Sequence, residues 1–209
     1  MANKFNKEHL AQDVFNILKG SFSEYTQEKV LDGICWAITE RKELEKGVDY
    51  KLLDKELKKA KIKGCRYWSK AAFEDAFEES NGSYTLKKGF NENNFTHEHV
   101  IPKAIIKASL QECVKNCDSF EEAKEKIIEI FDCSFACVLT KEEADLVDKD
   151  YKDSMPSGAT TISKIEHPWE RYCNKIENIY DVTWSIGRGW IFSEVKPNAI
   201  NVKEYKFEK

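Results

Sequence analysis

The sequence contains no long apolar run, no internal repeat and no low-complexity segment. A helix that spans a bilayer needs about 20 consecutive apolar residues, so we expect no membrane-spanning segment. Residues 1–19 mix Lys, Glu, His and Asp with single apolar residues, whereas a secretory signal needs an uninterrupted apolar stretch. We therefore expect a cytoplasmic protein that does not associate with membranes.

An excess of basic residues is also missing, since the formal net charge is -4. Each phosphate contact needs a cation, so the overall charge counts against a nucleic-acid ligand. Residues 51–70 differ, because eight basic and two acidic side chains give them a local charge of +6. They form either a solvated helix face and turn or a surface that follows a phosphate backbone. The candidate contacts to nucleic acid in this stretch are Lys58, Lys59, Lys61, Lys63, Arg66 and Lys70.

The seven cysteines are an odd number, which argues for free thiols in an intracellular protein. Two pairs have a four-residue spacing, Cys113 with Cys117 and Cys133 with Cys137. Structural zinc sites usually use the tighter C-x2-C spacing. We therefore expect buried free thiols rather than a structural zinc ion.

With 209 residues, the chain can form one or two domains and bury a core without disulfides. Apolar periodicity predicts an α+β fold that is mostly helical, with a helical region at 1–90 and a second region at 91–209. The predicted helices of the first region cover 8–19, 26–46 with Thr26 as its cap, 49–60 and 69–79. The last two, joined by the basic turn, could form a DNA-binding helix-turn-helix.

The second region alternates short strands with helices. Strands are predicted at 95–101 and 134–139, and a terminal hairpin at 182–195. Helices are predicted from Pro102 to about Lys115, over 120–131 behind Asp118 or Ser119, from Lys141 to about Asp150, and at 169–176. Thr140 and Glu143 form a capping-box pattern for the helix that begins at Lys141.

Histidine is scarce, and two of the four histidines flank Glu98. Hydrolysis of a phosphodiester needs a base to activate water and a cation to stabilise charge on the phosphate. A neutral histidine can accept the proton near pH 7, and a carboxylate is a natural ligand for Mg²⁺ or Mn²⁺. In a regular strand Glu98 would point away from His97 and His99, so convergence requires a bend. A polar surface strand or an arm of a structural zinc site is the alternative.

Glu98-His99-Val100-Ile101-Pro102 resembles the (Asp/Glu)-His-(Ile/Val)-(Ile/Val)-Pro segment of HNH (ββα-metal) nucleases. Residues 137–145 resemble the strand and helix that complete the motif in that family, and residues 154–157 resemble the segment after that helix. The resemblance covers residues 95–158. It implies an HNH-like core with a helical insert, joined here to the terminal hairpin.

By this resemblance Glu98 and Asp145 bind one Mg²⁺ or Mn²⁺ ion, and His99 is the general base. His97 is either a further polar group at the phosphate or a surface residue. The sequence departs from the family in two places: Ala136 stands where the middle asparagine is usual, and residues 103–131 form a long helical insert.

Arg171 is a further candidate contact to phosphate, since its planar fork of donors suits that group. A surface ion pair with Glu166 or Glu170 is the alternative. The leading hypothesis is a metal-dependent endonuclease that cuts DNA. The alternative is a non-cutting HNH-like scaffold that binds nucleic acid or protein. A homodimer and a protein partner stay open.

Overall fold

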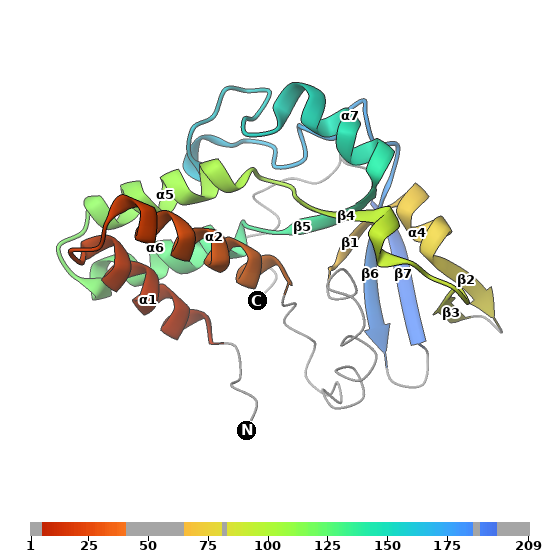
Figure 1. Cartoon of the computed structure of the whole chain (residues 1–209), viewed down its shortest axis with the longest axis horizontal. Coiled ribbons are helices and arrows are strands. Elements are labelled where there is room, and N and C mark those ends of the chain that lie inside the picture. The colour runs from red at the N-terminus through yellow and green to blue at the C-terminus, as the bar shows by residue number, and fades with distance from the viewer. Residues whose placement is uncertain (1–5, 41–64, 81–82, 186–188, 196–209) are drawn as a thin grey trace.

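The computed structural model of the chain describes residues 6–40, 65–80, 83–185 and 189–195. These residues form an α+β fold with six α-helices and one mixed sheet of seven strands. The helices labelled α1, α2, α5 and α6 gather at one end of the molecule, and the sheet lies toward the other end (Figure 1). None of the helices in these ranges is long and apolar enough to cross a membrane.

The first two helices begin at polar side chains. α1 (Lys7–Lys19) confirms the helix predicted over 8–19, and the Asn6 side chain accepts hydrogen bonds from backbone N–H groups of its first turn. α2 (Glu24–Glu40) begins before the predicted cap Thr26. The reason is that the Ser23 hydroxyl accepts the Thr26 N–H at 3.3 Å, so Ser23 serves as the cap.

Three predictions fall wholly or partly on residues 41–64, which lie outside the described residues. These are the continuation of α2 to residue 46, the helix over 49–60, and the helix-turn-helix that needs it. They stay predictions.

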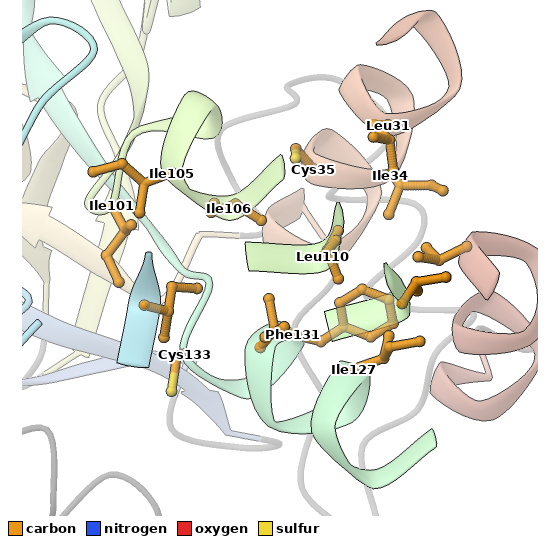
Figure 2. Packing of buried hydrophobic residues seen from close by; sticks show 14 of the residues in the cluster. Leu31, Ile34, Cys35, Ile101, Ile105, Ile106, Leu110, Ile127, Phe131 and Cys133 are labelled. Carbon is orange, nitrogen blue, oxygen red and sulfur yellow. The ribbon is translucent and has the colours of Figure 1, made fainter. Parts of the chain in front are cut away.

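α5 (Lys103–Lys115) and α6 (Phe120–Asp132) confirm the two predicted helices of the insert. Pro102 precedes α5, and the Ser119 hydroxyl caps α6. α1 packs against both of these helices and α2 packs against α5, around one apolar cluster to which Leu31, Leu110 and Phe131 contribute (Figure 2). The insert therefore completes the core of the N-terminal helices, and it is more than a long connection between strands.

The strand order of the sheet is β2-β3-β7-β6-β1-β5-β4. Its strands are β1 (Tyr67–Ser69), β2 (Phe77–Ser80), β3 (Ser83–Leu86), β4 (Phe95–His99), β5 (Ala136–Thr140), β6 (Ile179–Ser185) and β7 (Gly189–Val195). Only β1 and β5 are parallel, and β4 pairs antiparallel with β5 at one edge. α4 (Lys70–Ala76) covers one face with Phe73, and α7 (Lys141–Tyr151) covers the other with Val147.

Strands interrupt the helical region that was predicted at 1–90. The helix predicted over 69–79 is present as the shorter α4, with β1 directly before it and β2 directly after it, and β3 follows at 83–86. The helical spacing of Phe73, Ala76 and Phe77 continues past the true end of α4, because these side chains pack on the sheet whichever conformation carries them. The sheet also joins strands from both sides of the division expected at residue 90.

After α7, one of the two predicted elements is confirmed and the other is wrong. The terminal hairpin is confirmed, since β6 and β7 pair antiparallel from Ile179↔Val195 to Ser185↔Gly189. The helix predicted at 169–176 is wrong, because this segment forms successive turns, with Asn174 at φ 65. A positive φ at a non-glycine residue is incompatible with a continuous right-handed helix.

Glu143 links the starts of two helices. It completes the predicted capping box of α7 by accepting the Thr140 N–H at 3.0 Å. The same oxygen accepts the Ser69 hydroxyl at 2.5 Å, and the Ser69 oxygen accepts the Ala72 N–H at the start of α4. One carboxylate therefore holds together the two strand-to-helix turns at the ends of the parallel pair β1 and β5.

Replacing Glu143 by alanine should lower the free energy of unfolding by about 1–2 kcal/mol, because it removes a helix cap and leaves the buried Ser69 hydroxyl without its acceptor. Glu143→Gln keeps an acceptor oxygen and should lose less. Urea denaturation measures both changes. The exposed neighbour Glu142 provides the control, and its replacement by alanine should change stability by about 0.5 kcal/mol or less.

Candidate functional site

β4 carries the three polar residues of the candidate site as a regular strand. Its side chains alternate between buried and half-buried from Phe95 to His99. The register places His97 opposite Val138 and Glu98 opposite Cys137. Val138 belongs to the cluster on the α4 face and Cys137 to the cluster on the α7 face. Because paired residues share a face, the two histidines lie on one side of the sheet and Glu98 lies on the other.

On the α7 face, Glu98 binds a guanidinium. Arg171 is 0% exposed, and its Nη1 donates to Glu98 Oε1 at 3.1 Å. Nη2 of the same group donates to Asp148 Oδ1 on α7 at 3.4 Å. Nη1 also donates to the backbone oxygen of His99 at 2.8 Å. The Arg171 guanidinium therefore occupies the space between the strand acid and a helix acid.

Burial governs the charge state of this centre. Removal from water raises the pKa of Glu98, the Arg171 guanidinium offsets only part of that rise, and Asp148 adds to it. Burial also raises the pKa of the Tyr172 hydroxyl well above its usual range, and the negative charge of Glu98 contributes. Tyr172 is therefore a neutral neighbour of the ion pair at physiological pH.

Asp145, the predicted second metal ligand, is exposed on α7, while Asp148 one turn later faces Arg171. The structure therefore does not bring Asp145, Glu98 and His99 to one point. Among the residues that the structure describes, no three His, Cys, Asp or Glu side chains gather where they could hold a metal ion. The two acids that do converge already share a cation, so this arrangement does not fit a Mg²⁺ or Mn²⁺ ion.

His99 lies on the opposite face, where it packs against α2. Its Nε2 is 3.3 Å from both the Thr39 hydroxyl and the backbone oxygen of Cys35. The pKa of His99 is lowered to about 3, first by burial and then by His97 and nearby cations, while the hydrogen bond to the Cys35 backbone opposes the shift. The ring is therefore neutral at pH 7, as a general base must be, but it faces away from Glu98.

His97 packs beside His99, with ring centroids 5.4 Å apart, and both contact the indole of Trp36 at 4.8 and 4.9 Å. Burial lowers the pKa of His97 to about 4, and the backbone of Thr39 opposes this only in part. His97 is therefore a buried residue, and the surface alternative for it is wrong.

The predicted contacts to nucleic acid are described only in part. Arg66 forms a two-pronged ion pair with Asp181, with Nη2 to Oδ2 at 2.5 Å, and its side chain is 39% exposed. Lys70 is half-buried at the start of α4. Lys58, Lys59, Lys61 and Lys63 lie outside the described residues. For Arg171, neither a surface ion pair nor a direct phosphate contact fits, since it is fully buried.

Sequence reasoning missed Asp148, Trp36 and Thr39. Asp148 follows the predicted ligand Asp145 by about one helical turn, so both residues lie on a similar face of the helix. Helical periodicity alone does not decide which of the two faces β4. Trp36 and Thr39 come from α2, about 60 residues before the histidines that they contact. Nothing in the local sequence of β4 indicates that pairing.

All seven cysteines are free thiols. Cys137 is fully buried in the sheet, and burial raises its pKa well above the usual value. A buried neutral thiol behaves as a small apolar side chain. The pair Cys133 and Cys137 is therefore part of the core.

The fold and the centre on β4 define an α+β protein with an arginine buried between a strand acid and a helix acid. No protein-family model matches the chain, and neither a curated protein nor a solved structure matches it.

Proposed function

We propose that this chain is a nucleic-acid-binding protein with an HNH-like ββα scaffold that does not hydrolyse its ligand. One observation carries the proposal: the Arg171 guanidinium lies between Glu98 of β4 and Asp148 of α7. In the family that the sequence resembles, acids in these two elements would hold the catalytic metal ion. The buried cation supplies positive charge there permanently and opens no coordination site for water.

The separation of the candidate base His99 from the candidate metal ligand Glu98 supports the same proposal. Metal-assisted hydrolysis needs the base and the metal ligand on one side of the scissile phosphate. β4 instead places His99 against α2 and Glu98 against α7. A base that is neutral but enclosed by Trp36 and Thr39 cannot reach a phosphate bound on the α7 face.

The distribution of charge along the sequence indicates that the ligand is a nucleic acid. Residues 51–70 carry the local charge of +6 in a chain of net charge -4, and cations concentrated in one segment are the usual electrostatic footprint of phosphate binding. α7 is acidic, with five acidic and two basic residues, so it repels a phosphate backbone. We therefore place the binding surface on the basic segment.

A metal-dependent endonuclease is the second candidate, and the path of the chain favours it. β4 and β5 pair antiparallel, α7 follows β5 directly, and α7 packs against both strands. This is the ββα order that the resemblance implies. For cutting to occur, Arg171 would have to leave Glu98, and His99 would have to leave its contacts with α2.

A cleavage assay separates the two candidates. Full-length protein is incubated with single- and double-stranded DNA and RNA in Mg²⁺, Mn²⁺ or Ni²⁺, beside the Glu98→Gln and His99→Gln variants. We expect intact nucleic acid in every mixture. Cutting by the wild type that either variant abolishes would establish the nuclease and exclude the non-cutting scaffold.

Binding is tested by replacing Lys58, Lys59, Lys61 and Lys63 together with glutamine. Affinity for nucleic acid should fall, and the slope of log K against log salt should decrease by about one for each lysine that contacts a phosphate. The control replaces four exposed lysines on and after α7, namely Lys141, Lys149, Lys152 and Lys164. An equal loss in both variants would mean that only total charge matters and would contradict a defined binding surface.

A further inference from the structure

We propose that the outer side of α2 binds a second copy of this chain, with the two α2 helices packed antiparallel. Four residues of α2 form the contact, and together they are called the α2 seam: Tyr25, Lys29, Asp32 and Trp36. This inference concerns self-association and does not rest on the proposed function.

Exposed aromatic side chains concentrate at α2. Among the residues that the structure describes, four large apolar side chains are exposed, and three of them are Phe22 just before α2 and Tyr25 and Trp36 on it. Tyr25 is 72% exposed, whereas the opposite side of α2 packs into the helical core through Leu31 and Ile34. A second apolar stripe on a helix that already buries one side is typical of an interaction surface.

The seam residues have the spacing of a coiled coil. Tyr25, Lys29, Asp32 and Trp36 follow one another at intervals of four, three and four residues, which is the alternation of a and d positions along a packed helix. Gly33 lies beside the seam. Among the described residues, nothing outside its own turn of helix lies within 4 Å of the place that a Cβ would occupy there. A neighbouring helix therefore has room to approach.

Trp36 is held in position from within the chain. Its ring packs on the rings of His97 and His99, with centroids 4.8 and 4.9 Å away, and 36% of the residue stays exposed. A ring that is fixed on its inner side loses little freedom when a partner covers its outer side. Rigid aromatic anchors of this kind contribute most of the affinity at protein interfaces.

An antiparallel pair of α2 helices is complementary at every seam position. With a two-fold axis through the middle of the seam, Tyr25 of each copy lies opposite Trp36 of the other, and Lys29 lies opposite Asp32. Aromatic rings therefore meet aromatic rings and cations meet anions, twice in each case. A parallel pair would place Lys29 against Lys29 and Asp32 against Asp32, and such like-charge contacts are repulsive.

The charge around the seam favours a second copy over a strongly charged partner. Lys107 of α5 pairs with Asp32 at 3.1 Å and also with Glu28, and Lys103 lies 3.7 Å from Asp32. On and beside the seam three cations face three anions, namely Lys29, Lys103, Lys107, Glu24, Glu28 and Asp32. A phosphate backbone requires an excess of cations, whereas a balanced surface suits a copy of itself.

Sedimentation velocity of the full chain over a concentration series tests the association. The monomer has a mass of 24.3 kDa, and a contact of this size should give a weak dimer that forms reversibly as the concentration rises. In Lys29→Asp, acids face acids at both ends of the axis, so the dissociation constant should rise by about tenfold. Lys115→Asp makes the same charge change at an exposed position at the end of α5 and should leave it unchanged.

Two results would overturn the proposal. One is a wild type that stays monomeric up to about 1 mM, the weak limit of specific association. The other is a Lys29→Asp variant that associates as strongly as Lys115→Asp.

Mixed cysteine variants test the antiparallel order. Tyr25→Cys and Trp36→Cys, each shown to be folded by circular dichroism, are oxidised separately and as a mixture, and non-reducing electrophoresis detects joined dimers. Because the two positions face each other in the antiparallel pair, we expect a disulfide-joined dimer in the mixture. Each variant alone, and the wild type, should stay unjoined. Tyr25→Cys joined to itself would show a parallel pair, and it would overturn the arrangement, as would a mixture that does not join.

Discussion

Replacing Arg171 by methionine should lower the free energy of unfolding by about 3–5 kcal/mol, because it leaves a buried carboxylate without its counter-ion. Glu98 is 16% exposed and loses its partner at 3.1 Å. The backbone oxygen of His99 loses a donor at the same time. Urea denaturation at pH 7 measures the change. Since burial already raises the pKa of Glu98, Glu98 should take up a proton in the variant, and the loss should shrink as the pH falls.

Two further variants identify the cause. Adding Glu98→Gln to Arg171→Met removes the unpaired charge and should restore part of the lost stability. Arg66→Met is the matched control, since it breaks an arginine–aspartate pair in which the arginine is 39% exposed, and such pairs contribute about 1 kcal/mol or less. If both arginine variants lose the same small amount, Arg171 is not a buried counter-ion and the charged centre between β4 and α7 does not exist.

Acid should destabilise the protein through His97 and His99. Burial lowers their pKa values to about 4 and about 3, against about 6.5 in an unfolded chain. A lowered pKa in the folded state means that stability is complete above pH 6.5 and is lost as protons bind the unfolded chain below it. At pH 4 the loss is on the order of 3 kcal/mol for each histidine.

The free energy of unfolding, measured by urea titration at several pH values from 7 to 4, checks this prediction. His97→Phe keeps the contact with Trp36, and His99→Gln keeps a group that can hydrogen-bond Thr39. Each variant should reduce the slope of the free energy of unfolding against pH by about 1.4 kcal/mol per pH unit. His9→Gln, at an exposed position, should leave it unchanged. A wild type equally stable at pH 7 and pH 4 would mean that the two rings are solvated.

The elements that were best predicted from the sequence have strong local signals. α7 begins after its cap Thr140, where the capping box is complete within four residues, and α5 begins after a proline. The sheet was harder to foresee. β1 has only three residues, and its partners β5 and β6 are about 70 and 110 residues away. No periodicity reveals such pairing, so the helical spacing around Phe73 dominated the prediction.

For the candidate site, the sequence located the segment but not its arrangement. Glu98, His99 and Arg171 all lie at or near the buried centre. Because β4 is a regular strand, Glu98 lies on one face of the sheet and the two histidines lie on the other. The alternation of side chains along a strand indicates this arrangement, but the family resemblance favoured a shared site. The sequence did not predict the partners of Arg171. Glu98 is 73 residues away, and the acids Glu166 and Glu170 lie much closer to Arg171 in the sequence.

The order of the strands affects how the chain folds during synthesis. β1 lies between β5 and β6, and β3 is hydrogen-bonded to β7. Strands that are synthesised early therefore pair only after later strands have been synthesised. Until Ile179–Val195 has left the ribosome, one side of β1 in the nascent chain stays unpaired. Exposed strand edges promote association between chains. The ribosome-bound intermediate should therefore be the stage at which this protein depends most on chaperones.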